Sequence, residues 1–239
     1  MKIARSGLRE IPAIDEINLV YYCLVSYIYL MSPKPAPEGR RKRRAHARPD
    51  EILDAALAAF IEKGFDATRM EDVAARAGLS KAGVYLYFES KDALLKALIV
   101  REVAPIAQRA EALAIAGAED PEATLRAIAT LALSRLFDPR VFAVPHLLIS
   151  ISSRFPEIVA FYRAEVIERA RGAITSIIRA GIAKGVFRDI DPDIAMRLFV
   201  GPFMFEALWR HVFAGEPGIR HSDDILDLIL SMLRKEAAR

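Results

Sequence analysis

The chain is poor in the residues that several common kinds of site require. It has one cysteine, Cys23, among 239 residues, which excludes a disulfide within the chain and a metal site built from cysteines. The four histidines are scattered, and the motifs of zinc proteases, serine hydrolases, P-loops and dinucleotide-binding loops are missing from the sequence. We therefore predict that the protein is not an enzyme and holds no metal or cofactor. A chain with so little cysteine is typical of the cytoplasm.

The sequence also lacks the alternation of apolar and polar residues that indicates β-strands. Alanine, leucine, isoleucine, arginine and glutamate dominate instead, and this composition favours helices. Hydrophobic residues make up 53% of the chain and charged residues 27%, a balance that supports a folded core. We predict an all-α fold.

A membrane-spanning run of ordinary length is missing as well, although residues 17–31 are almost entirely apolar. That run is shorter than the roughly 20 residues that a span needs, and acidic residues precede it with no small-residue cleavage site after it. Three interpretations remain: translation starts at Met31 and residues 1–30 are spurious, the segment anchors the protein to a membrane or a partner, or it forms an added helix. We favour the first and expect no membrane partner.

Downstream of that run the sequence contains a dense cluster of basic residues, which the formal net charge of only +3 conceals. Such a cluster is typical of a segment that binds a polyanion, either nucleic acid or an anionic membrane, and a solvated flexible tail is the alternative. The cluster consists of Arg40, Arg41, Lys42, Arg43, Arg44 and Arg48.

From Pro49 the pattern becomes helical, because apolar residues recur at spacings of three and four between Ile52 and Phe60. Proline suits a first helical turn, and Gly64 is a good C-terminal stop. This predicts one helix over 49–63.

Two short helices are predicted to follow. Thr68 and Glu71 form a capping-box pattern that opens the first of them, Gly78 ends it, and Ser80 caps the second at Lys81. Two helices joined by a tight turn that contains glycine are typical of a helix-turn-helix.

The spacing within this pair supports the same interpretation. A helix-turn-helix needs a small residue where the helices cross, a residue tolerant of positive φ in the turn, and an apolar residue on the inner side of the second helix. Ala74, Gly78 and Val84 meet these needs at offsets of four and six. An unrelated helical hairpin remains an alternative at this point.

Residues 52–95 resemble the DNA-binding domain of the TetR (tetracycline repressor) family of bacterial regulators. The resemblance rests on ordered motifs that cover about a fifth of the chain. They are Ala59-Phe60 with Lys63-Gly64-Phe65, Ala67-Thr68, Val73-Ala74-Ala75-Arg76-Ala77-Gly78, Ser80-Lys81, Gly83-Val84-Tyr85, Tyr87-Phe88, and Ser90-Lys91-Asp92-Ala93-Leu94-Leu95.

This resemblance implies that the third helix enters the major groove with its N-terminal residues nearest the bases. Lys81 would donate to guanine or phosphate, Ala82 would contact a thymine methyl, and Gly83 would permit close approach or serve helix packing. A basic arm would add sequence-blind affinity. The full set of expected DNA contacts is Thr68, Arg69, Ser80, Lys81, Ala82, Gly83, Tyr85, Tyr87 and Lys91, with Arg43 and Arg44 in the arm; the two tyrosines and Thr68 also have purely structural explanations.

Helices are predicted almost throughout the remainder, with breaks at glycine and proline. The expected spans are 92–116, 121–137, 141–153, 156–184, 192–213 and 222–235. Residues 197–213 are apolar nearly all round, which predicts burial on several sides.

The resemblance implies that the last two long helices form a four-helix bundle in a homodimer, and that a pocket between helices holds a small molecule. The expected interface includes Phe199, Phe205, Trp209, Ile225 and Ile229. Candidate pocket residues are His146, Ser150, Phe161, Tyr162, Phe203 and Met204, each of which has core packing or simple surface exposure as its alternative.

The sequence therefore predicts an N-terminal extension and linker (1–47), a three-helix helix-turn-helix domain (48–96) and a helical effector-binding and dimerisation domain (97–239). The expected function is sequence-specific regulation of transcription, as a repressor released from a palindromic operator by an unknown, largely hydrophobic effector. The partners would be double-stranded DNA, the effector and a second copy of the chain. The alternative is a membrane-associated or small-molecule-binding helical protein without a specific DNA site.

Overall fold

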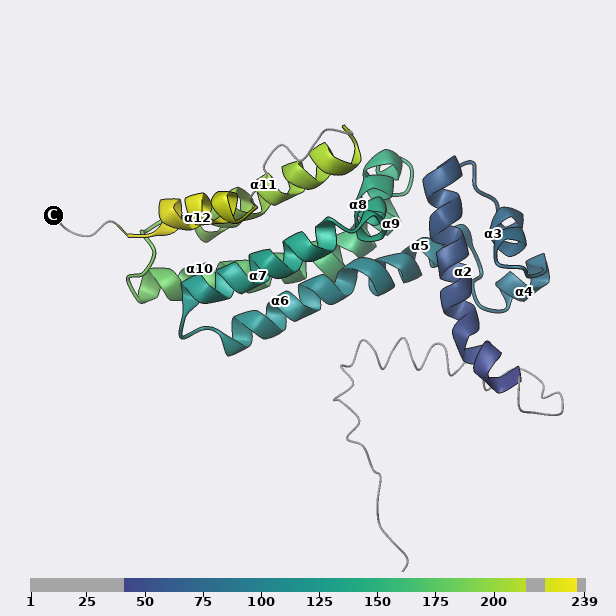
Figure 1. The fold of residues 1–239 in the computed structure, drawn as a ribbon, viewed down its shortest axis with the longest axis horizontal. Helices are drawn as coiled ribbons and strands as arrows, with labels where there is room; N and C mark the ends of the chain where they lie inside the picture. The colour runs from purple at the N-terminus through teal and green to yellow at the C-terminus, as the bar shows by residue number, and fades with distance from the viewer. Residues whose placement is uncertain (1–40, 214–221, 236–239) are drawn as a thin grey trace, which may run out of the picture.

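The computed structural model describes residues 41–213 and 222–235, and for residues 41–47, 222 and 223 it describes the backbone only. Within these ranges the chain is a set of helices, and the extended pairing described is one isolated antiparallel bridge between Phe187 and Arg234. The predicted all-α fold is confirmed. Figure 1 shows the short helices at one end of an elongated helical body.

The N-terminal unit is built from four helices: α2 (Arg41–Lys63), α3 (Met70–Arg76), α4 (Lys81–Tyr85) and α5 (Lys91–Leu98). Gly64 and Gly78 end α2 and α3 at φ values of +78° and +65°, which L side chains rarely adopt. The predicted stops are therefore confirmed. The predicted start is wrong, because α2 begins at Arg41 and Pro49 lies inside it. Part of the segment expected to be a linker thus has a helical backbone.

A long helix connects this unit to the body. The helix α5 continues through one π-helical turn, η1 (Ile99–Val103), into α6 (Ala104–Ala116), which confirms the helix predicted over 92–116. A second composite helix runs from α9 (Pro156–Tyr162) through the π-helical η2 (Arg163–Ile167) into α10 (Glu168–Ala183). Single π-turns of this kind change the register of a helix and often lie near functional sites.

The other four helices described in the body begin at a proline or a serine. Asp120, Asp138 and Asp191 cap three of them by accepting hydrogen bonds from backbone N–H groups of the first turn. These helices are α7 (Pro121–Leu136), α8 (Pro139–Ile151), α11 (Pro192–His211) and α12 (Ser222–Leu233).

The buried apolar side chains form two separate clusters. The first core joins the helix-turn-helix unit to α8 and α9 and includes Ile52, Leu98, Val144 and Ile151. The second core lies among α6, α7, α10, α11 and α12. In Figure 1, α6, α7 and α10 run side by side, with α11 and α12 above them. The packing therefore places α8 with the N-terminal unit, which the division at residues 96 and 97 did not anticipate.

Candidate nucleic-acid interface and effector domain

The helix α4 has the geometry expected of a recognition helix. The Ser80 side chain caps it by accepting a hydrogen bond from the Gly83 N–H at 3.1 Å, and Val84 is fully buried against the first core. These two contacts confirm the predicted cap and the predicted inner residue. The opposite side of α4 presents Lys81, Ala82 and Tyr85, all of which are exposed.

The Lys81 ammonium group is exposed but already engaged within the domain. Its Nζ lies 2.6 Å from Oε1 of Glu71 on α3 and 5.8 Å from the centre of the Tyr85 ring. The hydrogen bond from Lys81 lowers the pKa of the Glu71 carboxyl, and the same bond raises the pKa of Lys81. A base or phosphate must therefore compete with Glu71 for this cation.

Glycine at position 83 serves the cap of its own helix. A Cβ at Gly83 would lie 3.3 Å from the Ser80 Oγ, closer than most real Cβ contacts. A side chain at this position would therefore press on the cap. This role stands beside the predicted close approach of DNA.

The predicted role of Thr68 is wrong. Its side chain is 0% exposed, and the single hydrogen of its hydroxyl is shared between the Gly64 carbonyl at 2.7 Å and the Ala59 carbonyl at 3.2 Å. This hydroxyl faces inward, where it fastens the α2–α3 loop, and cannot reach a phosphate.

The predicted capping box is displaced by one residue. The helix α3 begins at Met70 with Arg69 at the cap position, and the Asp72 carboxylate accepts a hydrogen bond from the Arg69 N–H at 2.8 Å. The Asp72 carboxylate also forms an ion pair with the Lys63 ammonium group at 2.7 Å. The hydrogen bond from Lys63, together with the one from the Arg69 N–H, lowers the pKa of Asp72. Arg69 is exposed and stays a candidate contact.

Lys91 and Tyr87 lie at the edge of the domain. The Lys91 ammonium group donates to the carbonyls of Phe65 and Asp66 at 2.8 and 3.1 Å and lies 4.8 Å from the Phe65 ring centre. Burial lowers its pKa. Tyr87 is half-buried against the first core. Lys91 therefore has a structural role in addition to the predicted phosphate contact.

The arm residues Arg43 and Arg44 lie on the N-terminal part of α2, where only the backbone is described. Residues 1–40, with Cys23, and residues 214–221, with His221, lie outside the described residues.

The structure does not bring the six candidate pocket residues together. His146 and Ser150 are exposed on α8, Phe161 and Tyr162 pack against the first core, and Phe203 is buried in the second core, with Met204 half-buried beside it on α11. Burial raises the pKa of Tyr162 to about 12, so its hydroxyl is a neutral group of the interior. The prediction of one pocket lined by all six is wrong, because they belong to two cores and to the surface.

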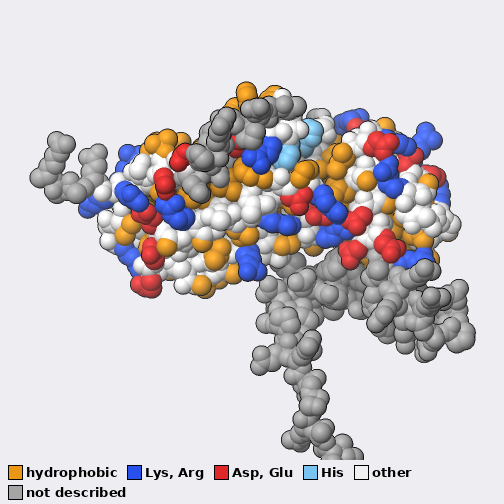
Figure 2. All heavy atoms as spheres, in the orientation of Figure 1, with side chains coloured by type: hydrophobic (Ala, Val, Ile, Leu, Met, Phe, Trp, Pro, Cys, Tyr) orange, Lys and Arg blue, Asp and Glu red, His pale blue; other side chains and the backbone are white. Residues whose placement is uncertain are grey.

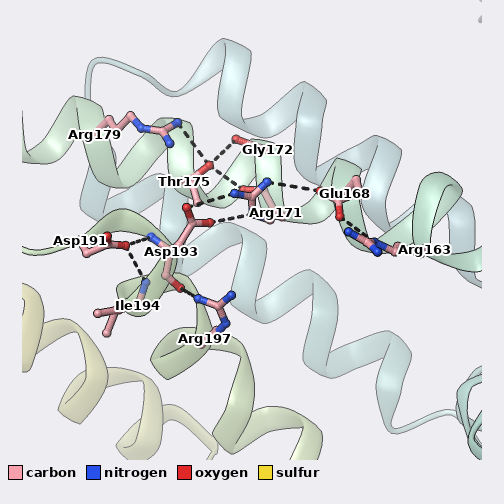
Figure 3. A network of polar contacts seen from close by, with 10 residues as sticks. All are labelled: Arg163, Glu168, Arg171, Gly172, Thr175, Arg179, Asp191, Asp193, Ile194 and Arg197. Atoms are coloured by element: carbon pink, nitrogen blue, oxygen red, sulfur yellow. Dashed lines mark hydrogen bonds and ion pairs between the residues drawn. The ribbon is translucent and has the colours of Figure 1, made fainter. Parts of the chain in front are cut away.

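A hollow that the structure does show lies elsewhere. It is an open groove of about 790 Å³ between α9, η2, α10 and α11, lined by Ala160, Arg163, Ala164, Ile167, Glu168, Arg171, Met196 and Arg197. Figure 3 shows its polar network. Arg171 donates to both oxygens of Asp193 at 2.7 and 3.0 Å and to Glu168 at 3.3 Å, so the groove's acidic groups are already paired. This network braces α10 against α11.

Two predicted interface residues are buried within the subunit. Phe199 and Ile229 are 2% and 6% exposed in the second core, so their assignment to a dimer interface is wrong. Phe205 and Trp209 are 58% and 38% exposed, and Ile225 is half-buried. The sequence-based prediction did not include four further exposed apolar side chains on the same two helices: Ile194, Leu198, Leu228 and Met232.

A charged network at the junction between the domains was also missed. The Arg101 guanidinium in η1 donates to Asp54 on α2 at 2.8 Å and to the buried Glu102 at 2.6 Å. Arg140 at the start of α8 pairs with the same Asp54. Figure 2 shows basic and acidic side chains side by side where the two domains meet. Arg101 and its partners on α2 are about 50 positions apart in the sequence, so no local pattern could predict this contact.

Within the described residues, no helix is long and apolar enough to cross a membrane, and no cluster of three or more histidine, cysteine or acidic side chains could hold a metal ion.

Two family models match the chain. Residues 52–98 match the family described as bacterial regulatory proteins, tetR family, and residues 115–233 match the tetracyclin repressor-like, C-terminal domain. The HTH-type transcriptional repressor KstR2 of Rhodococcus jostii (strain RHA1) is 27% identical over 191 residues, which are 79% of this chain and 88% of KstR2.

Two further similarities differ in extent. The HTH-type transcriptional regulator YfiR of Bacillus subtilis (strain 168) is 45% identical over 69 residues, 29% of this chain, and the matched part spans only 31% of YfiR. The structure of the TetR family transcriptional regulator PfmR from Thermus thermophilus is similar with a TM-score of 0.60 at 25% identity, over 84% of this chain and 100% of PfmR.

Proposed function

The chain belongs to the TetR family of bacterial DNA-binding transcriptional regulators, and on that premise we propose that it is a homodimeric repressor that leaves a palindromic operator when a small, largely hydrophobic effector binds. The observation that carries the proposal is the exposed side of α4, with Lys81, Ala82 and Tyr85 beside the Ser80 cap. A membrane-associated or purely ligand-binding helical protein is not favoured, because residues 52–98 match a DNA-binding family.

One recognition helix of this size reads too few base pairs for a unique site. A two-fold dimer doubles the site and requires its two recognition helices to meet successive major grooves, about 34–36 Å apart. In this arrangement Lys81 and Ala82 contact base edges, while Tyr85, Tyr87, Lys91 and the basic N-terminal part of α2 approach phosphates.

The exposed apolar side of α11 and α12 supports the dimer. We name this surface the dimer face, and it consists of Ile194, Leu198, Phe205, Trp209, Leu228 and Met232. Apolar side chains that line one surface of two adjacent helices are typical of an interaction site, since a monomer rarely exposes such a patch. Two copies would bury it as a four-helix bundle.

The polarity of regulation follows by analogy. KstR2 is named a repressor, and it is similar to this chain over most of its length. A repressor of this kind releases DNA when the effector favours a dimer whose recognition helices no longer match the groove spacing.

The test is selection of random duplex DNA by the full-length protein, read by sequencing. We expect enrichment of an inverted repeat whose half-sites lie one helical turn apart. Ala82→Glu should abolish the enrichment because it places a carboxylate against the bases, and the same change at the exposed Ala127 of α7 is the control. Enrichment that survives Ala82→Glu, or none with the wild-type protein at moderate salt, would contradict the proposal.

A further inference from the structure

The two hydrophobic cores meet where α8 packs against α11, and we call this contact the seam. The helix α8 shares the first core with the helix-turn-helix unit and is fastened to it at both ends. Near its start, Arg140 pairs with Asp54 of α2, and just after its end the rings of Phe155 and Phe65 lie 5.1 Å apart, edge to face. A displacement of α8 must therefore carry the recognition helix with it.

The other side of the seam belongs to α11, which also carries the dimer face. The buried Phe142 of α8 stacks on His211 of α11 with ring centres 4.8 Å apart and lies 6.1 Å from the ring of His146. The guanidinium of Arg210 lies 3.9 Å from the centre of the Phe137 ring at the end of α7. Histidine side chains are visible in Figure 2 on this part of the surface. Aromatic walls thus line the seam.

On α11, one turn before Arg210, one oxygen of a buried carboxylate has no hydrogen-bond partner among the described residues. Glu206 of α11 is 5% exposed, and its Oε1 accepts no hydrogen bond from any described residue. One turn further along the same helix, the buried Nε of Arg210 also has no acceptor among the described residues. By contrast, the similarly buried Glu102 accepts two hydrogen bonds from Arg101, at 2.6 and 2.9 Å.

An unsatisfied buried carboxylate oxygen is costly, since it loses its hydration and gains no hydrogen bond in exchange. A fold keeps such a pair of groups where something else completes them. What completes this pair must donate one hydrogen bond to Glu206 and accept one from Arg210.

We propose that the seam is the effector site, and that the effector is a small neutral aromatic or alicyclic molecule whose hydroxyl bridges Glu206 and Arg210. A hydroxyl both donates and accepts, so it satisfies the two groups together. A carboxylate would face the like charge of Glu206, and an ammonium group would leave the Arg210 Nε without an acceptor. A flat apolar ring would stack on Phe137 and Phe142 in place of the Arg210 guanidinium and the His211 ring, which lie against them in this structure. This inference rests on the proposed function and names the ligand chemistry.

Binding at this place explains the coupling to DNA. A ring that enters the seam separates α8 from α11. Since α8 carries the helix-turn-helix unit and α11 carries the dimer face, this separation changes the distance between the two recognition helices of a dimer.

The test measures binding of 2-naphthol and of naphthalene, which lacks the hydroxyl, to the full-length protein by calorimetry without DNA. The wild-type protein should prefer 2-naphthol by roughly ten- to a hundredfold. Glu206→Leu and, separately, Arg210→Met should remove the preference. Glu168→Gln, in the open groove, is the control and should keep it.

A second readout separates a binding role from a structural one. Replacing an uncompensated buried carboxylate with an apolar side chain of similar size should raise the Tm of Glu206→Leu by about 2–6 °C. A structural carboxylate would instead lower the Tm on replacement. If the wild-type protein shows no preference for 2-naphthol, or if both variants keep it, the proposed site is wrong. Because no DNA is present, that result leaves the proposed operator binding intact, whereas failure of the DNA selection leaves this measurement unaffected.

Discussion

The side chain of Lys81 is the clearest case in which one residue is expected to decide what the protein reads. In the free protein its ammonium group is held 2.6 Å from Glu71, so it approaches DNA only by leaving that partner. The exchange favours a site that offers a well-placed acceptor, such as the edge of a guanine, over a mobile phosphate contact. Glu71 therefore acts as a competitor that sharpens the choice.

We expect Lys81→Ala to change which sequences are preferred, with roughly tenfold loss of discrimination at one base position of each half-site.

Glu71→Gln should strengthen DNA binding instead of weakening it, because it frees the Lys81 ammonium group. We expect higher affinity for unrelated DNA and a steeper dependence of that affinity on salt. Selection and salt titration of both variants measure these effects. A uniform loss of affinity in Lys81→Ala, with the preference unchanged, would instead make Lys81 a phosphate contact.

Thr68 gives the opposite kind of prediction, because its hydroxyl is used inside the domain. Thr68→Val keeps the shape and removes the hydrogen bonds to the Gly64 and Ala59 carbonyls. We expect a loss of about 1 kcal/mol in the free energy of unfolding, measured in urea. Affinity for the operator should be unchanged under conditions where both proteins are folded. Weaker DNA binding at unchanged stability would restore the phosphate contact that the sequence suggested.

At the scale of the elements, the π-turn η1 places two consecutive charged residues on the junction between the domains. Arg101 reaches across to the carbonyl of Asp50 at 3.1 Å and to the side chain of Asp54, while Glu102 stays buried beneath it. The connector helix thus holds α2 through one guanidinium. A change in the connector can therefore reach α2 through this contact as well as through the first core.

Arg101→Met should lower the free energy of unfolding by about 1–3 kcal/mol, because it leaves the Glu102 carboxylate buried with only the more distant Arg140, at 3.6 Å. Arg163→Met is the matched control: Arg163 is exposed and its Nε pairs with Glu168 alone, so its loss should be close to zero. Equilibrium unfolding of both variants in urea decides the point. Equal stability of the two variants would show that the junction network contributes nothing.

Local signals predicted the helix limits well. Prolines after capping aspartates gave the starts of α7 and α11 as predicted, whereas α8 begins at Pro139, two residues before its predicted start, and Gly64, Gly78 and Gly185 ended their helices at positive φ. These signals act within a few residues, so one sequence is enough to read them. The predicted start of α2 was wrong for the same reason, since the local rule begins a helix at Pro49, whereas Pro49 lies inside α2.

Side-chain surroundings in the body could not be predicted in this way. The helix α11 is apolar nearly all round, so periodicity does not tell that Phe199 faces the core while Phe205 faces outward. The pocket failed because its candidates come from helices whose mutual packing no local pattern encodes. One signal was present and unused: Glu206 is a single acidic residue in the apolar stretch 198–209.

At the scale of the whole molecule, the protein consists of two cores joined at a seam, with the recognition helix attached to one and the dimer face to the other. Regulation then depends on the second copy. A movement between the cores changes nothing that DNA can read in a single subunit, but in a dimer it changes the distance between two recognition helices. The dimer face is therefore as necessary for function as α4.

This predicts the effect of one charge on that face. Phe205→Glu places a carboxylate at the centre of the expected bundle, where it would be buried opposite its own copy. We expect a monomer by sedimentation velocity and at least a hundredfold weaker binding to the inverted repeat. Ile115→Glu is the control, because Ile115 is 83% exposed near the end of α6, a helix that lies on the opposite side of the body from α11 and α12 in Figure 1. A Phe205→Glu protein that stays dimeric and binds the repeat as tightly as the wild type would place the dimer interface on another surface. A movement of α8 relative to α11 would then have to change the distance between the recognition helices about a different two-fold axis.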